Sequence, residues 1–252
     1  MIYGTKISTT KAEIENGLIR LGLTAGMMLE VHCSLSSFGH VEGGAETVIY
    51  ALKNTIGTSG AILMPSFKLS PDLPLNDTDR KLGLTQKIRI LQDDQDKSAM
   101  GIVSDTFRKM PDVITGEGLF RISAWGKDAE KHASLVFQHL IDSNGHALLI
   151  GVDIYRMSTM HYVENSMPDE IKNRFIPPEE ARTIYPESEW FIEAWAPPVK
   201  AWYTIQDKAY ENGYIADTMI GNSKCMLVKV KMVTDLYRSA LHTDPFRLYG
   251  LI

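Results

Sequence analysis

Residues 31–67 constrain the fold more than any other segment of this chain. A short apolar run at 29–31 leads into a turn rich in serine and glycine, and a second apolar run at 61–64 ends at Pro65. Between them, apolar residues recur at helical spacing at Val48, Ile49, Leu52 and Ile56. A strand, a turn, a helix and a second strand make a βαβ unit, whose two strands are parallel.

The rest of the chain continues this alternation of helices and strands. Helical patterns cover 9–21, 101–110, 127–141, 157–183, 205–212 and 231–241, and the pattern over 157–183 is interrupted at Pro168 and at Pro177-Pro178. Strands are expected near 120–126, 147–152, 185–205 and 225–230. Residues 66–98 are polar and interrupted by prolines, which predicts a long loop. We therefore expect an α/β protein: one domain over residues 1–252, with a central mixed sheet in a layered α/β/α architecture.

Composition excludes several classes of protein. The formal net charge of −5 argues against nucleic acid, because nucleic-acid-binding proteins carry basic patches. The two cysteines, Cys33 and Cys225, lie far apart in the sequence and are expected to be free thiols in a reducing compartment. The sequence shows no signal peptide and no apolar run of membrane-spanning length, so we expect a cytoplasmic protein. His132 and His139 lack a third ligand nearby, so no metal site is expected.

The turn after the first strand has the properties of a cradle for an anionic ligand. Its backbone N–H groups, its hydroxyls and the positive end of the following helix all suit a negative charge. Serine and glycine are also ordinary turn residues, so these residue types alone do not settle the matter. No GxGxxG, P-loop or GxSxG pattern is present, which argues against a dinucleotide site, a nucleoside triphosphate site and a serine hydrolase.

His161 and Glu164 form the pattern most suggestive of catalysis. Their i, i+3 spacing places both side chains on one helical face. A carboxylate beside a histidine fixes its tautomer and stabilises its cation, as a base that deprotonates an amine requires. The alternative is a surface pair contributing a few tenths of a kcal/mol.

His32 and Cys33 end the first strand. His32 faces either a ligand or the core, and the sequence leaves both open. Cys33 would be a nucleophile only beside a base and positive charges, and neither is evident, so it is interpreted as a small residue.

Seven segments, in order over residues 5–240, resemble the aminoglycoside N3-acetyltransferase family. They are VHCSLSSFGHVEGGAETVIYAL, GAILMPSF, AMGIVSDTFRKMPDV, SAWGKDAEKH, ALLIGVD, HYVEN and IGNSKCMLVKVKMVTD. The resemblance implies direct acetyl transfer from acetyl-CoA, as co-substrate, to the 3-amino group of an aminoglycoside antibiotic. The partners would be CoA and a cationic amine, and a homodimer is left open.

The resemblance also implies roles for individual residues. His161 would be the general base, and Glu164 would orient it. Asp153 and Glu117 would bind the substrate. The cofactor-binding residues would be His32, Cys33, Ser34, Leu35, Ser36, Ser37, Phe38, Gly39, Gly43 and Gly44.

The chain departs from the family pattern in three places. Residues 114–118 replace an Arg-Ser-x-His-Pro-like stretch, so that Glu117 stands about where the family has histidine. Arg121 replaces a frequent serine, and the segment 133–146 is shorter than in relatives. Two alternatives therefore stay open: an acetyltransferase for a different amine, and a non-catalytic relative that binds CoA.

Overall fold

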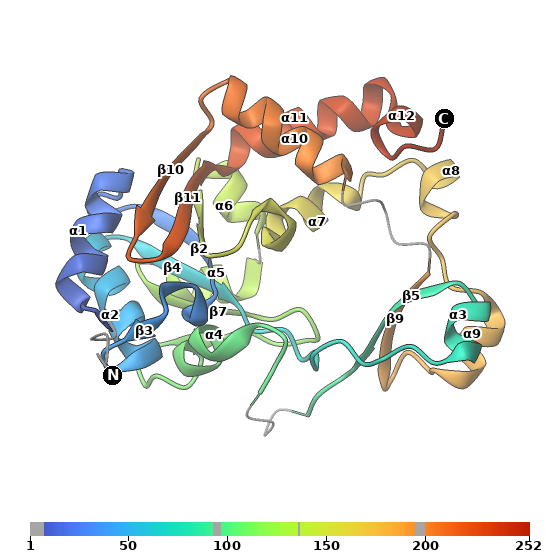
Figure 1. Cartoon of the computed structure of the whole chain (residues 1–252), viewed down its shortest axis with the longest axis horizontal. Helices are drawn as coiled ribbons and strands as arrows, with labels where there is room; N and C mark the ends of the chain where they lie inside the picture. Colours follow the sequence, from blue (N-terminus) through green and yellow to red (C-terminus); the bar gives the residue numbers. More distant parts are fainter. Residues whose placement is uncertain (1–7, 93–96, 136, 195–199) are drawn as a thin grey trace, which may run out of the picture.

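The computed structural model describes residues 8–92, 97–135, 137–194 and 200–252. Within these residues a central sheet of seven strands has the order β10-β11-β8-β2-β4-β7-β6 (Figure 1). Strand β2 is parallel to both β4 and β8, and the outer pairs are antiparallel. The strands are β2 (Met28–Cys33), β4 (Ala61–Pro65), β6 (Ile114–Thr115), β7 (Ile122–Gly126), β8 (His146–Ile150), β10 (Ile215–Ile220) and β11 (Ser223–Lys229).

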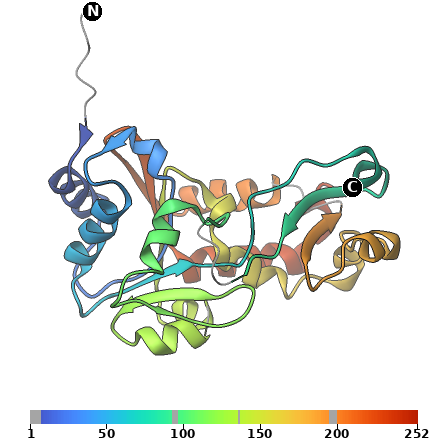
Figure 2. The ribbon, with the colours of Figure 1, turned by 90° about the horizontal axis from the view of Figure 1, so that it is seen from below.

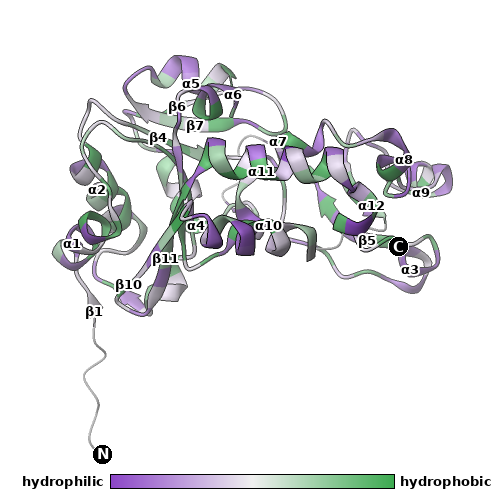
Figure 3. Ribbon diagram, turned by 90° about the horizontal axis from the view of Figure 1, so that it is seen from above, coloured by the Kyte–Doolittle hydropathy of each residue, from purple (hydrophilic) through white to green (hydrophobic). Residues whose placement is uncertain are grey.

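Helices cover both faces of this sheet, which confirms the predicted layered α/β architecture. One face packs against α1 (Lys11–Leu21), α2 (Gly44–Ile56) and α4 (Gly101–Phe107). The other packs against α6 (Gln138–Asp142), α7 (Ser158–Glu164), α10 (Lys200–Glu211), α11 (Val230–Thr243) and α12 (Pro245–Leu248). Figure 3 shows the hydrophobic residues gathered along the central strands, while α5 (Ala129–Leu135) is hydrophilic on its outer side.

The alternation of side chains along β2 decides which residues face the site described below. Leu29 and Val31 join the core under α1, α2 and α4. Because successive strand residues point to opposite faces, Glu30 and His32 point toward the face that carries α7. Their cross-strand neighbours on β8, Ala147 and Leu149, belong to the core on that face.

A smaller lobe extends from one end of the molecule (Figures 1 and 2). We define it by the antiparallel strands β5 (Leu84–Arg89) and β9 (Trp190–Ala194) with helices α3 (Asp77–Lys81) and α9 (Glu179–Ile184). It has its own small apolar cluster, and Asp79 is buried within it beside Lys87 and Tyr185. The Asp79 carboxylate accepts hydrogen bonds from Lys87 Nζ at 2.5 Å and from the Tyr185 hydroxyl at 2.6 Å. The single domain expected over 1–252 stays a prediction.

Short elements complete the chain. They are β1 (Ser8–Thr9), which pairs in parallel with β3 (His40–Val41), the 3₁₀ turns η1 (Leu35–Phe38) and η2 (Ile154–Arg156), and α8 (Asp169–Lys172). No helix among the described residues is long and apolar enough to cross a membrane.

Several element predictions were wrong in detail. Residues 66–98 are not one loop, because they contain α3 and β5. The strand expected over 185–205 is limited to β9, and a helix already begins at Lys200. The helix expected over 127–141 is two helices, α5 and α6, and strand β10 was missed. The interruptions predicted within 157–183 are confirmed, because α8 begins after Pro168 and α9 begins after Pro178. Residues 195–199 of the strand predicted over 185–205 and residues 93–96 of the loop predicted over 66–98 lie outside the described residues.

Three parallel strands bring their carboxyl ends to one edge of the sheet. Strand β2 continues into η1, β4 into Ser66, and β8 into Asp153, η2 and α7. In α/β sheets, ligands bind outside the carboxyl ends of the strands. The serine-rich turn and the helix carrying His161 therefore meet where this fold class places its sites.

Candidate active site

His161 projects from α7 into solvent, with 60% of its side chain exposed. Its Nδ1 lies 3.0 Å from Glu164 Oε2, and its ring makes an edge contact with Trp202 at 4.7 Å between centroids. Because Nδ1 faces a carboxylate, it carries a proton in the neutral ring, and Nε2 is left as the basic nitrogen. Among the described residues His161 makes no other side-chain hydrogen bond, so Nε2 is available to a substrate.

Glu164 is held on its other oxygen by two helices that lie far away in the sequence. Its Oε1 accepts hydrogen bonds from Trp202 Nε1 on α10 and from the Tyr237 hydroxyl on α11, each at 2.8 Å. The Tyr237 hydroxyl lies 2.5 Å from the Tyr249 hydroxyl. Burial and the nearby charge of Glu164 raise the pKa of Tyr237, so this phenol stays protonated. The carboxylate is therefore fixed in position, and its remaining oxygen holds the imidazole.

Several negative charges act on His161. Desolvation by itself lowers the pKa of His161, but the hydrogen bond and charge of Glu164 and the charges of Glu193 and Glu30 outweigh it and raise the pKa above its ordinary value. Burial, together with the charges of Glu164 and Asp72, raises the pKa of Glu193 on β9, although the charge of His161 opposes this. The smaller lobe thus adds the negative charge of Glu193 to that of Glu164 around the imidazole, and a cationic substrate suits that environment.

The serine-rich part of the predicted cradle forms one 3₁₀ turn, η1, which is hydrogen-bonded to the sheet. The Ser34 N–H donates to the Ile150 carbonyl at 2.9 Å, and the Ser37 hydroxyl donates to the Ser34 carbonyl at 2.6 Å. Ser37 Oγ also lies 2.7 Å from Ser223 Oγ on β11. A Cβ at Gly151, which has φ +63°, would fall 1.9 Å from Ser37 Oγ. The turn is therefore packed directly against the end of β8, where only glycine fits.

The predicted cofactor-binding residues fall into two groups. Ser34 and Ser36 line the outer side of the turn, with hydroxyls 3.2 Å apart, and Gly39, Gly43 and Gly44 lead to the start of α2. Phe38 is buried in the core under α2, and Leu35 packs against that core. Burial raises the pKa of Cys33, with the charge of Cys225 adding to this, so its thiol stays protonated.

His32 lies behind the turn and contacts a residue that the sequence analysis missed. Its Nε2 is 2.7 Å from Oε1 of Glu30, which is completely buried. The same oxygen accepts the Ser158 N–H at 2.6 Å, at the start of α7. Glu30 is a charged residue between Leu29 and Val31, and this alternation is also typical of a strand with one face exposed to solvent, so the sequence does not show that Glu30 is buried.

The two predicted substrate-binding residues are placed differently. Asp153 follows β8, and its carboxylate accepts the Tyr155 N–H at 3.0 Å and the Tyr203 hydroxyl at 2.8 Å. Glu117 is exposed in the loop between β6 and β7, and no contact within the described chain joins it to His161. The same loop carries Phe120, whose ring meets those of Phe67 and Phe191 at 5.2 and 5.9 Å.

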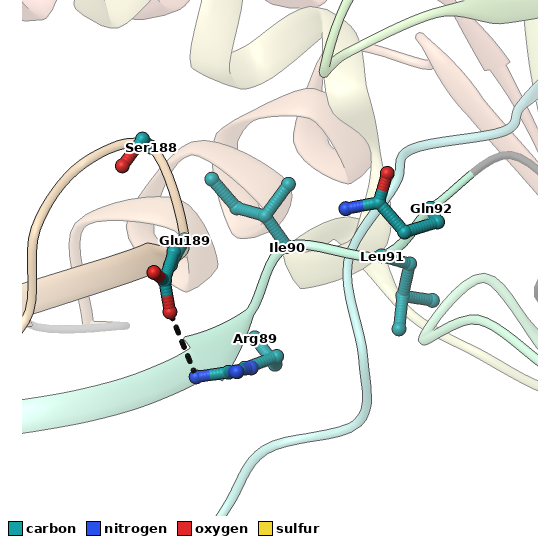
Figure 4. A pocket seen from close by; sticks show the side chains of 6 residues that line it. All are labelled: Arg89, Ile90, Leu91, Gln92, Ser188 and Glu189. Atoms are coloured by element: carbon teal, nitrogen blue, oxygen red, sulfur yellow. Dashed lines mark ion pairs between the residues drawn. The ribbon is translucent and has the colours of Figure 1, made fainter.

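A pocket of about 530 Å³ lies elsewhere, at the end of β5 (Figure 4). It is lined by Arg89, Ile90, Leu91, Gln92, Ser188 and Glu189. Arg89 and Glu189 form an ion pair across it at 3.3 Å. Within the described chain His161 and Glu164 form side-chain hydrogen bonds with each other, Trp202 and Tyr237, and with none of these six residues, so the pocket is separate from the candidate catalytic pair.

Comparison with known proteins identifies the family. Residues 31–242 match the model of the aminoglycoside 3-N-acetyltransferase family. The chain is 29% identical to aminoglycoside N(3)-acetyltransferase IV of Salmonella over 167 residues, which are 61% of this chain and 58% of the relative. It is 28% identical over 204 residues to YokD, a prophage-derived aminoglycoside N(3')-acetyltransferase-like protein of Bacillus subtilis, covering 70% and 73% of the two chains. The chain therefore belongs to the aminoglycoside 3-N-acetyltransferase family.

Solved structures share the fold. The apoenzyme of aminoglycoside acetyltransferase AAC(3)-IVa superposes with a TM-score of 0.70 at 22% identity, over 98% of this chain and 93% of that one. The complex of AAC-IIIb with CoASH gives a TM-score of 0.68 at 17% identity, over 94% and 97%. At these identities the similarity concerns the fold alone.

Proposed function

We propose that this protein transfers the acetyl group of acetyl-CoA directly to the 3-amino group of an aminoglycoside, with His161 as the general base. The observation that carries the proposal is the exposed His161 imidazole, held by an anchored carboxylate and surrounded by further carboxylates. The family membership and the names of the relatives support the reaction type, and the solved complex of AAC-IIIb with CoASH supports the co-substrate.

The acceptor nitrogen arrives as an ammonium ion and is not a nucleophile until it loses a proton. His161 Nε2 takes that proton, while Glu164 holds the ring and offsets its new charge. The raised pKa of His161 makes it a stronger base than a free imidazole. The Glu193 and Asp72 carboxylates attract the other ammonium groups of the sugar.

The free amine then attacks the thioester carbonyl carbon. A C–N bond forms and the C–S bond breaks, and the second amine proton passes to the departing thiolate. The proton on His161 returns to solvent, so one ammonium ion and one acetyl-CoA give an amide, a CoA thiol and one proton. Burial raises the pKa of the Cys33 thiol, which therefore stays protonated and is not an activated nucleophile. Direct transfer needs no nucleophile on the protein, because no acyl-enzyme forms.

The turn η1 supplies groups for acetyl-CoA. The N–H groups of Leu35 and Ser36 begin the turn and have no acceptor within it. Donors of this kind stabilise the thioester oxyanion, and one such donor is typically worth about 2.7–4 kcal/mol of barrier. Ser34 and Ser36 present hydroxyls on the same side, and Gly43 and Gly44 open α2 beside them. His32, Cys33, Ser37, Phe38 and Gly39 act as the supports of this turn.

Asp153 and Glu117 stay in the proposal as substrate-binding residues. Asp153 would act beside Tyr203, whose hydroxyl donates to it, and beside Tyr155, whose ring contacts Trp202. Glu117 would act from the loop that also carries Phe120.

A thiol-release assay tests the proposal. Purified protein, acetyl-CoA and a panel of amines are mixed, and free CoA thiol is measured. The expected result is release with gentamicin- or kanamycin-type acceptors, with mass spectrometry and NMR showing that the product is acetylated at the 3-amino group. Release only with other amines would favour the first alternative, an acetyltransferase for a different amine. Tight CoA binding without release from any amine would favour the non-catalytic alternative.

A further inference from the structure

Glu30 is a carboxylate in the middle of the central sheet. It is fully buried on β2, and its cross-strand partners are Leu63 on β4 and Ala147 on β8. Burying a carboxylate among such neighbours costs free energy, whereas an aliphatic side chain would fill the position without that cost. Glu30 Oε2 is buried and has no hydrogen-bond partner among the described residues. A residue this costly in a core strand calls for a reason other than packing.

The other oxygen of Glu30 connects two segments that lie 128 residues apart in the sequence. Oε1 accepts the Ser158 N–H at 2.6 Å and, more weakly, the Thr159 N–H at 3.4 Å. These are the first two residues of α7, whose N–H groups have no acceptor inside the helix. Met157, the preceding residue, provides no side-chain cap. Glu30 therefore takes the place of a local capping residue from a neighbouring strand.

The same oxygen also contacts His32, which lies two residues further along β2, just before the turn of the cradle. His32 Nε2 lies 2.7 Å from it, and a carboxylate that already accepts backbone N–H groups requires Nε2 to be the donor. His32 is followed at once by Cys33 and by the turn that begins at Ser34. One buried carboxylate thus joins the end of β2 to the start of α7.

His161 follows Ser158 by three residues, which is less than one helical turn and about 4.5 Å along the axis. A displacement of the start of α7 is therefore passed on to the imidazole with little loss. The charge of Glu30 also reaches His161 and raises its pKa together with Glu164 and Glu193.

We propose that Glu30 is a positioning residue for acetyl transfer: it fixes the helix of the general base against the strand of the acetyl-CoA turn. The inference rests on the proposed function. Glu30 touches neither substrate, and it acts through Ser158 on the position of His161 and through its charge on the basicity of that ring.

Besides Glu30, two charged groups among the described residues act on the pKa of His161, Glu164 on α7 and Glu193 on β9, and the test must keep them unchanged. Titratable groups on the neighbouring elements also stay in place: Tyr237 on α11, which donates to Glu164, Tyr155 on η2, Asp72, whose charge acts on Glu193, and His32 on β2, while α10 contacts the ring with the neutral Trp202.

The test compares Glu30→Gln with Glu30→Leu. Glutamine keeps an acceptor oxygen and the volume but removes the charge, whereas leucine removes every acceptor. We expect kcat to fall several-fold in Glu30→Gln and by roughly 10- to 100-fold in Glu30→Leu, because small misplacements of a catalytic group are costly. KM for both substrates should stay within about twofold, since neither is touched. The His161 ring proton signal in NMR, assigned by its loss in His161→Asn, should titrate at lower pH in Glu30→Gln than in the wild type.

Asp79→Asn is the matched control. It also removes a buried carboxylate, in the smaller lobe, and should lower the melting temperature without moving the titration of His161 or kcat. If Glu30→Gln keeps the wild-type kcat and the wild-type His161 titration, the inference is overturned even if Glu30→Leu does not fold. If both Glu30 variants match Asp79→Asn, losing stability but no kcat, the role of Glu30 is structural only and the inference fails. The NMR titration does not depend on activity, so a shift there with full activity in His161→Asn would sink the proposed function and leave the link between Glu30 and His161 intact.

Discussion

Glu164→Gln should reverse the hydrogen bond that orients His161 and leave its surroundings in place. Trp202 Nε1, which can only donate, points at Glu164 Oε1 together with the Tyr237 hydroxyl. The amide oxygen of glutamine must stay where these donors point, so its NH₂ group faces His161 Nδ1. Nδ1 must then accept, and the proton of the neutral ring moves to Nε2. In that tautomer Nε2 cannot take a proton from the substrate.

The size of the effect follows from this loss of the base. General-base catalysis typically contributes about 10²- to 10⁴-fold in rate. At about 1.36 kcal/mol per tenfold this is roughly 2.7–5.4 kcal/mol of barrier. We expect kcat to fall within this range, and KM for the aminoglycoside to change much less because Glu193 and Asp72 remain. The charge and hydrogen bond of Glu164 raise the pKa of His161, so the residual activity should have its acid limb at lower pH.

The assay is CoA thiol release at saturating acetyl-CoA, measured as a function of pH. Glu170→Gln, an exposed position on the next helix, is the matched control and should behave as the wild type. A Glu164→Gln enzyme with the wild-type kcat and the wild-type pH profile would refute the tautomer argument. Loss of activity that follows loss of folded protein, seen by circular dichroism, would refute it as well.

Three further predictions follow from the structure. Gly151→Ala should lower the free energy of unfolding by about 1–3 kcal/mol more than Gly213→Ala in denaturant titrations, and it should raise KM for acetyl-CoA. Both glycines have positive φ, but only a Cβ at position 151 would meet Ser37. Equal losses of stability would contradict the packing of η1 against Gly151. Glu193→Gln should raise the aminoglycoside KM by roughly tenfold at low salt and less at high salt, and a salt-independent KM would argue against an electrostatic role. Burial lowers the pKa of His132, and the charge of His139 adds to this. Below the ordinary histidine pKa near 6.5 the unfolded state therefore binds more protons than the folded state, so stability should fall as the pH drops below about 6.5. His132→Leu should flatten this pH dependence in thermal melts.

The sequence predicted the parts of the fold that are local and strongly patterned. The βαβ unit of β2, α2 and β4 could be recognised because apolar strands flank an amphipathic helix and the turn residues stand between them. Strand β5 could not, because Gln86 and Lys87 give it a polar composition, and Lys87 is buried only through its pairing with Asp79. Strand β10 alternates weakly, since it is an edge strand with exposed positions at Ala216, Asp217 and Met219.

The candidate site was likewise predictable where its contacts are local in the sequence, and not where they join distant segments. His161 and Glu164 stand three residues apart on one helix, so their pairing could be predicted from spacing, and the hydrogen bond is present. Their supports come from elsewhere in the chain: Trp202 from α10 and Tyr237 from α11. Tyr237 has the spacing of an ordinary core residue, and only tertiary packing reveals that its hydroxyl meets Glu164. Glu30 was missed for the same reason, because its partner lies 128 residues away.

The most direct test of His161 as the general base is the rate of acetyl transfer by His161→Asn, measured as CoA thiol release with an aminoglycoside that the wild type acetylates. If His161 is the base, kcat falls by roughly 10²- to 10⁴-fold, with the acceptor still bound at near wild-type affinity in calorimetry. An undiminished rate would contradict this role and show that the proton is taken by another group.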